Sequence, residues 1–146
     1  MQGMDLIVRT VARMAAGFFA AFGMYLALYG HLGPAAGGLA GGALVAASLL
    51  LVLVAFGRSW AEDTAPVRTA ARLQCVAAVH LLVVGLAGLG GGYFLYNLLD
   101  KGRQFHVMSS GTVFYLGVGV AILTAAGLYA GVRALVTGGP EEEGEL

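Results

Sequence analysis

The sequence predicts an all-α membrane protein, built as a bundle of four transmembrane helices. Of its 146 residues, 59% are hydrophobic and only 11% are charged, whereas soluble domains carry roughly 25% charged residues. The few charges also avoid three long windows, at residues 14–57, 73–99 and 104–132. This composition argues against a water-soluble globular enzyme, and also against a disordered chain, which would be poor in apolar residues.

The uncharged windows accommodate four spans. A spanning helix needs about 20 apolar residues to cross a hydrocarbon core of roughly 30 Å, and the first window is about twice that length. The GHLGP run at residues 30–34 divides this window, because glycine and proline favour helix ends. We therefore expect one transmembrane domain over residues 1–137, with helices at about 5–29, 37–56, 72–98 and 112–135.

The charges outside the spans predict a tail and an orientation. Residues 138–146 (GGPEEEGEL) lack the apolar residues of a core, so we expect a disordered acidic tail. One side of the bundle would hold Arg9, Arg13, Arg58, Arg68, Arg72 and Arg133, and the other Lys101 and Arg103. Because the side richer in Lys and Arg faces the cytoplasm, we expect both termini and the 57–69 loop there.

A secretory signal peptide is the alternative interpretation of the first 35 residues, with Arg9 and Arg13 as its basic region. The apolar stretch that follows is longer than the usual length of about 7 to 15 residues. The segment at residues 34–36 also lacks a convincing cleavage site. We therefore prefer a retained membrane anchor.

Glycines four residues apart recur on three of the predicted helices. The pairs are Gly37 with Gly41, Gly38 with Gly42, Gly88 with Gly92 and Gly127 with Gly131. Apolar side chains gain nothing by leaving lipid, so membrane helices associate where small residues let backbones approach. The pairs predict packing seams, some of them against helices of other subunits. A Gly/Ala-rich genome is the alternative explanation.

Asp5, Arg9 and Arg13 are spaced four residues apart, which places them on one face of the first helix. Arg13 borders the uncharged window, so its guanidinium is expected to extend toward the membrane edge. The set is either an interfacial anchor or a polar contact with a neighbouring subunit.

Two histidines are candidates for an ion path. His31 follows the first helix in a glycine-rich turn, where it acts either as a solvated cap or as a proton carrier. His80 lies inside the third apolar window, and ionisable groups within a span are uncommon and indicate function. A hydrogen bond from a neutral imidazole to a neighbouring helix explains His80 equally. His106 is expected in a loop.

The sequence offers no catalytic machinery of its own. The predicted spans contain no midway carboxylate or lysine, which ion-conducting helices normally carry, and the chain has no triad, CxxC or HExxH pattern. The single cysteine, Cys75, is expected to be a small buried hydrophobe. Eight Lys plus Arg balance eight Asp plus Glu, which leaves no basic excess for nucleic acid. We expect no cofactor or metal, and a place in a larger assembly.

Two segments identify a family. Residues 6–13 (LIVRTVAR), followed by Gly30-His31, Pro34 and glycines up to Gly42, resemble the MnhB-type component of multisubunit Mrp-type cation/proton antiporters. The FYLGV segment at 114–118 is similar to the family's F-D-(I/L)-G-V at the start of the last helix. The likeness covers about residues 6–135.

The chain departs from the family pattern at two places. PAAGGLAGG at residues 34–42 stands where the family has PGGGFxGG, and Tyr115 stands where the family has an aspartate. These departures indicate a divergent branch. They also weaken any function that depends on the family's turn or on that carboxylate.

The resemblance implies a non-catalytic subunit in the plasma membrane of a prokaryote, surrounded by other antiporter subunits and supporting ion translocation and complex assembly. The same module occurs in complex I-related membrane-bound hydrogenases and other ferredoxin-linked oxidoreductase complexes, which is the second hypothesis. A purely structural membrane adaptor is the third. The candidate ion-path or subunit-contact residues are Arg9, Arg13, His31, Pro34, Gly37, Gly38, Gly41, Gly42 and His80.

Overall fold

The computed structural model describes residues 5–32, 37–57, 67–99, 102–103, 106 and 109–137. Within these ranges the chain is all-helical, with four long helices: α1 (Leu6–Tyr29), α2 (Gly37–Phe56), α4 (Val67–Ala87) and α5 (Thr112–Thr137). Short 3-10 turns follow α1 and α4, namely η1 (Gly30–Leu32) and η2 (Gly88–Gly91). All four long helices are long and apolar enough to cross a membrane, which confirms the predicted fold class.

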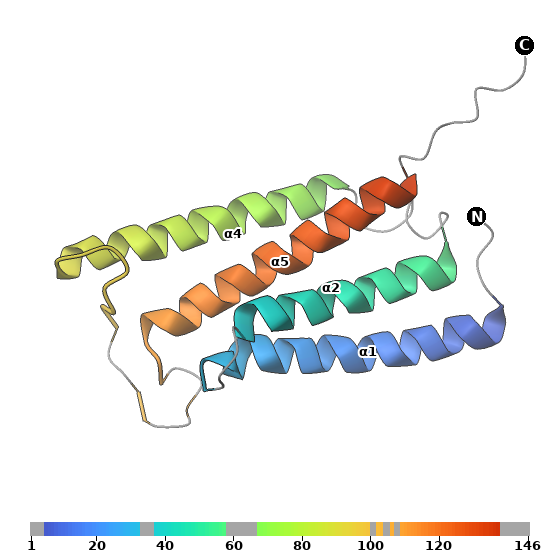
Figure 1. Ribbon diagram of the computed structural model, residues 1–146, viewed down its shortest axis with the longest axis horizontal. Coiled ribbons are helices and arrows are strands. Elements are labelled where there is room, and N and C mark those ends of the chain that lie inside the picture. The colour runs from blue at the N-terminus through green and yellow to red at the C-terminus, as the bar shows by residue number, and fades with distance from the viewer. Residues whose placement is uncertain are drawn as a thin grey trace, which may run out of the picture.

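The four helices lie side by side in the order α1, α2, α5, α4 (Figure 1). α2 packs between α1 and α5, and α5 packs between α2 and α4. Because α1 and α4 run antiparallel to α2 and α5, α1 and α4 end where α2 and α5 begin. We call this the turn end of the bundle. The opposite end, where α1 begins and α5 finishes, is the terminal end.

Both ends of the described chain, Asp5 and Thr137, lie at the terminal end, as an even number of spans requires (Figure 1). Three predicted features lie outside the described residues. They are Pro34, the 58–66 part of the predicted loop and the predicted tail at 138–146.

The third helix differs most from its prediction. We expected it at about residues 72–98, but α4 begins at Val67 and ends at Ala87. Glycines occupy four of the next five positions, and Gly92 has a φ of 116°, a left-handed conformation that ends a helix. Apolar content alone extended the predicted helix too far, because it does not register this glycine run.

The chain after η2 folds back over the end of α4. The N–H of Leu95 donates a hydrogen bond to the carbonyl oxygen of Gly85, at 3.3 Å. A Cβ on Gly88 would lie 2.5 Å from the backbone nitrogen of Tyr96, so the return of the chain requires glycine there. We call residues 93–99 the fold-back segment.

Glycines on two faces of α2 let it approach both neighbours. Gly37 and Gly41 face α1, and a Cβ on Gly41 would lie 2.5 Å from a carbonyl oxygen of that helix. Gly38 and Gly42 face α5, and a Cβ on Gly38 would overlap the carbonyl oxygen of Gly117. Both pairs act as packing seams, as their spacing predicts. Both seams join helices of this chain.

The other two predicted pairs are not seams. Gly88 begins η2 and Gly92 lies beyond it, so the two do not share a helical face. Gly127 approaches α4, where a Cβ would lie 3.1 Å from Nε2 of Gln74, but Gly131 faces open space. A spacing of four therefore marks a seam only where the helix continues and that face meets a neighbour.

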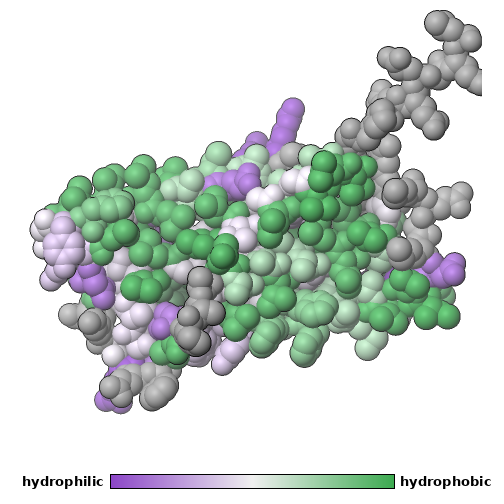
Figure 2. Space-filling model, viewed as in Figure 1, coloured by the Kyte–Doolittle hydropathy of each residue, from purple (hydrophilic) through white to green (hydrophobic). Residues whose placement is uncertain are grey.

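Small residues fill the interior of the bundle and large ones cover its outside. Among the described residues, the buried hydrophobic side chains are alanines together with Leu53 and Tyr129. Large apolar side chains such as Phe18, which is 71% exposed, point outward, and Figure 2 shows hydrophobic residues over much of the visible face. This arrangement is inverted relative to a soluble protein and fits a lipid environment.

Cys75 is exposed on α4, so the prediction that it is buried is wrong. The neighbouring Gln74 and Ala77 lie on the side of α4 that faces α5. Because α5 is the only long helix that α4 contacts within the described residues, much of the α4 surface stays uncovered, and Cys75 lies on that surface.

Candidate functional site at the turn end

His31 joins the end of α1 to the segment that precedes α5. Its Nδ1 lies 3.1 Å from the carbonyl oxygen of Leu28, and its Nε2 lies 3.1 Å from Oγ of Ser109, which is 78 residues away in the chain. A carbonyl oxygen only accepts, so Nδ1 carries the proton. In the neutral ring, Nε2 therefore accepts the hydroxyl proton of Ser109.

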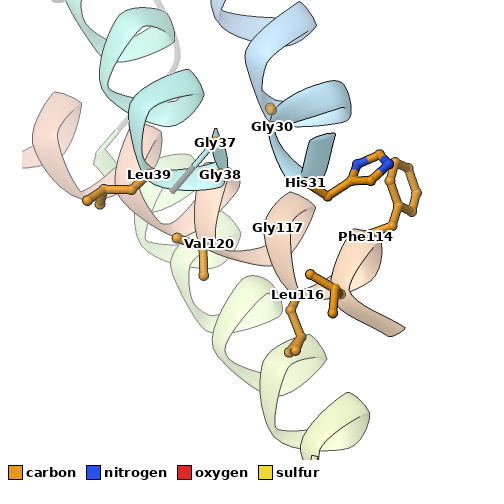
Figure 3. A pocket seen from close by; sticks show the side chains of 11 residues that line it. Gly30, His31, Gly37, Gly38, Leu39, Phe114, Leu116, Gly117 and Val120 are labelled. Carbon is orange, nitrogen blue, oxygen red and sulfur yellow. The ribbon is translucent and has the colours of Figure 1, made fainter. Parts of the chain in front are cut away.

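A cavity of about 320 Å³ lies beside His31 (Figure 3). Its walls come from the glycines on both sides of the turn and from the first turns of α5, where the ring of Phe114 meets His31 edge-on at 6.2 Å. Apart from His31, the lining residues are glycines and apolar residues. Among the described residues, the imidazole is therefore the one titratable group in the wall of this cavity.

The turn needs glycine where its two arms cross. A Cβ on Gly30 would overlap Cα of Gly37, and a Cβ on Gly37 would overlap Cα of Gly30. Gly37 and Gly38 line the cavity, whereas Gly41 and Gly42 lie one helical turn further along α2, in the two seams. The glycine-rich motif thus serves both the turn and the packing of α2.

A polar cluster at the start of α5 was missed by sequence reasoning. Asn97 Oδ1 accepts a hydrogen bond from the backbone N–H of Thr112 at 2.8 Å, and its Nδ2 donates to the carbonyl oxygen of Ser110 at 3.3 Å. In return, Oγ of Thr112 accepts the N–H of Leu98 at 3.2 Å. Asn97 therefore acts as a remote N-cap of α5.

The predicted 72–98 helix concealed this role of Asn97. The remaining signal was the Ser-Ser-Gly-Thr run directly before the apolar stretch of α5, which is typical of a helix start. The cluster matters for the site because it fixes the chain next to Ser109, the hydrogen-bond partner of His31.

His80 lies apart from this cavity. It is half-buried on α4, and its Nε2 donates to the carbonyl oxygen of Tyr115 in α5 at 3.1 Å. A Cβ on Gly119 would lie 3.0 Å from the imidazole, so the glycine makes room for it. The contact is the helix-to-helix hydrogen bond that the sequence analysis gave as the structural explanation of His80.

Replacing His80 by leucine is expected to have a small effect, because one interhelical hydrogen bond in a membrane contributes only about 0.6 kcal/mol on average. The melting temperature of the complex should fall slightly, and cation/proton exchange in vesicles should stay within about twofold of the original. A large loss of exchange in a fully assembled complex would instead assign His80 to a proton relay.

Arg9 and Arg13 lie at the terminal end, far along α1 from His31 (Figure 1). Their guanidinium carbons lie 5.6 and 5.0 Å from the ring centroid of Phe56, at the end of α2. The predicted site residues thus separate into a turn-end group, an arginine pair and His80. No three His, Cys, Asp or Glu side chains gather as a metal-binding group in the described part of the chain.

The sequence matches the family described as a domain related to the MnhB subunit of Na+/H+ antiporter over residues 7–130. The chain belongs to the MnhB family. The match includes the His31 turn, both seams of α2 and the start of α5, and it confirms the resemblance found in the sequence. This member of the MnhB family is a multi-pass membrane protein, with four candidate spans.

Three relatives illustrate the likeness. The chain is 29% identical to the MnhB-type component of the Na+/H+ antiporter of Bacillus subtilis, over 82% of this chain and 85% of that protein. It is 26% identical to putative antiporter subunit mnhB2 of Staphylococcus saprophyticus, over 92% and 96%. It is 30% identical to an uncharacterized protein of Methanocaldococcus jannaschii, over 84% of this chain and 48% of that protein. The chain therefore spans about half the length of this archaeal relative.

Proposed function

We propose that this chain is a non-catalytic subunit of a Mrp-type Na+(cation)/H+ antiporter complex, in which His31 and its turn border the ion route. The placement of His31 supports this most directly. Its half-buried imidazole lies in the wall of the turn-end cavity, next to a backbone crossing between two apolar spans. Irregular backbone near a membrane core is tolerated only where protein or water satisfies it.

The hydrogen bonds of His31 suit proton exchange. The donation from Nδ1 to Leu28 anchors the ring in either charge state. Nε2 accepts from Ser109 when the ring is neutral and donates to the same oxygen when the ring is charged, because a hydroxyl both donates and accepts. A proton can therefore be gained or lost at Nε2 while the contact between α1 and the segment before α5 is kept.

Transport also needs groups that this chain lacks. The three uncharged windows leave the spans without a carboxylate or lysine midway through the bilayer, and helices that conduct ions normally have such a group. The charged residues that carry the ion across would then belong to neighbouring subunits. This chain would support translocation and hold the assembly together.

The partners decide between the two complexes in which this module is expected. Antiporter subunits purified with the chain and identified by mass spectrometry would support the proposal. Hydrogenase or ferredoxin-linked redox subunits would instead assign the chain to an energy-converting oxidoreductase complex. The described arginines favour a cytoplasmic terminal end, since Arg9, Arg13, Arg68, Arg72 and Arg133 lie there.

Replacing His31 by alanine is expected to lower Na+-dependent proton exchange severalfold in vesicles while the complex still assembles. His31→Asn is the informative companion, because its amide can replace a hydrogen bond but cannot titrate, so it should be as inactive as alanine. His106→Ala, at an exposed histidine, is the matched control and should be fully active. Loss of assembly in His31→Ala together with full activity in His31→Asn would give His31 a structural role only.

A further inference from the structure

Two arginines share one aromatic ring at the terminal end. Arg9 and Arg13 lie one helical turn apart on α1, and both guanidinium groups lie over the ring of Phe56. Arg13 is exposed and Arg9 is half-buried. Stacking against the ring holds the two cations in a defined place instead of letting them move freely in water.

No acidic side chain neutralises this pair within the described residues. Neither arginine forms a salt bridge there. Asp5, four residues before Arg9, is exposed, and its backbone carbonyl accepts the Arg9 amide at 3.1 Å. The Nε of Arg9 is buried and has no hydrogen-bond acceptor in that part of the chain. The aromatic face attracts both cations but supplies no oxygen for their N–H groups.

The pair lies at the boundary of an apolar span. The candidate span of α1 begins at Leu6, and the uncharged window begins directly after Arg13. Two cations at this depth need a counter-anion, because charge is unfavourable beside the hydrocarbon core. Lipid phosphates lie at this level, and basic groups between membrane helices bind anionic headgroups.

We propose that Arg9 and Arg13, held on the ring of Phe56, form a binding site for the phosphate group of an anionic phospholipid. The planar guanidinium forks match phosphate oxygens in pairs, and the buried Nε of Arg9 supplies a further donor. The lipid would fasten the start of α1 to the end of α2 at the membrane surface. This site is separate from the His31 cavity and does not depend on the proposed transport function.

Lipid retention in the assembled complex tests the proposal. The complex is exchanged into nanodiscs of phosphatidylcholine with a minor fraction of phosphatidylglycerol, and the tightly bound lipids are counted by native mass spectrometry. The double variant Arg9→Gln with Arg13→Gln should retain phosphatidylglycerol about tenfold more weakly, as expected when charge-assisted hydrogen bonds are lost. Arg72→Gln, at an exposed arginine at the same end of the bundle, should retain it normally.

Phe56→Leu provides a second test that keeps both charges. Without the ring, the guanidinium groups lose their fixed positions, so retention should weaken by less than in the double glutamine variant. Unchanged phosphatidylglycerol retention in both variants would overturn the proposal. Loss of a neighbouring subunit from the double variant with retention unchanged would also overturn it, since the counter-anion would then be a carboxylate of that subunit.

Discussion

Replacing Gly38 by leucine is expected to exclude this subunit from its complex. A Cβ at this position already overlaps the carbonyl oxygen of Gly117, so the backbones of α2 and α5 would have to separate. Overpacking a soluble core costs about 1–3 kcal/mol even when side chains can move. Here the obstacle is backbone, and lipid provides no hydrophobic drive to press the helices together again.

The amount of this subunit recovered with a tagged neighbouring subunit measures the effect. Since about 1.4 kcal/mol corresponds to a factor of ten, we expect recovery of the Gly38→Leu protein to fall at least about tenfold. Gly17→Leu is the matched control, because Gly17 lies within α1 with no atom near its Cβ position. Normal recovery of Gly38→Leu would contradict the close packing of α2 on α5.

Replacing Asn97 by leucine is expected to release the fold-back segment from α5. The change removes the acceptor for the Thr112 N–H and the donor to the Ser110 carbonyl oxygen. Loss of an N-cap costs about 0.5–2 kcal/mol, and each buried group left without a partner adds about 1–3 kcal/mol. Hydrogen exchange in the intact complex should therefore become faster over residues 93–99 and 109–112.

Asn97→Asp separates the two contacts of this side chain. The carboxylate keeps the acceptor for Thr112 and places negative charge at the start of α5, which the helix dipole favours. Only the donor to Ser110 is lost, so we expect exchange close to that of the original protein. If the leucine variant exchanged as slowly as the original, Asn97 would not be the cap that holds this segment.

The connection from Asn97 to His31 gives the leucine variant a second consequence. Ser109, the hydrogen-bond partner of His31, directly precedes Ser110, whose carbonyl oxygen Asn97 holds. Weakening of this cluster should therefore also loosen the His31 ring, and the faster exchange should extend into η1. A residue in the fold-back segment thus affects the candidate site through the start of α5.

Sequence reasoning succeeded where the physical signal is local. The uncharged windows located all four apolar helices, and α2 was expected at residues 37–56, where the structure has it. It failed for α4, because apolar residues 93–98 continue the hydropathy signal after a glycine run has already ended the helix. It also misjudged Cys75, because composition does not tell which face of a helix meets a neighbour.

The glycine pairs separate these two kinds of information. Four pairs have the same spacing, but only the two on α2 meet backbones of neighbouring helices on the same side, while Gly88 and Gly92 serve a helix end. A helix with two neighbours uses both of its glycine faces. One at the edge of the row, such as α4, leaves much of its surface free.

The sequence by itself determined that this chain has four apolar helices, that it belongs to a membrane family and that its spans lack charged residues. Hydropathy and motifs are properties of short segments, so they can be seen without coordinates. Only the tertiary structure decided which polar groups meet: His31 with Ser109, His80 with Tyr115, and the two arginines with Phe56. These contacts depend on the order of the helices and on their rotation about their own axes, which the backbone contacts at the glycine seams set.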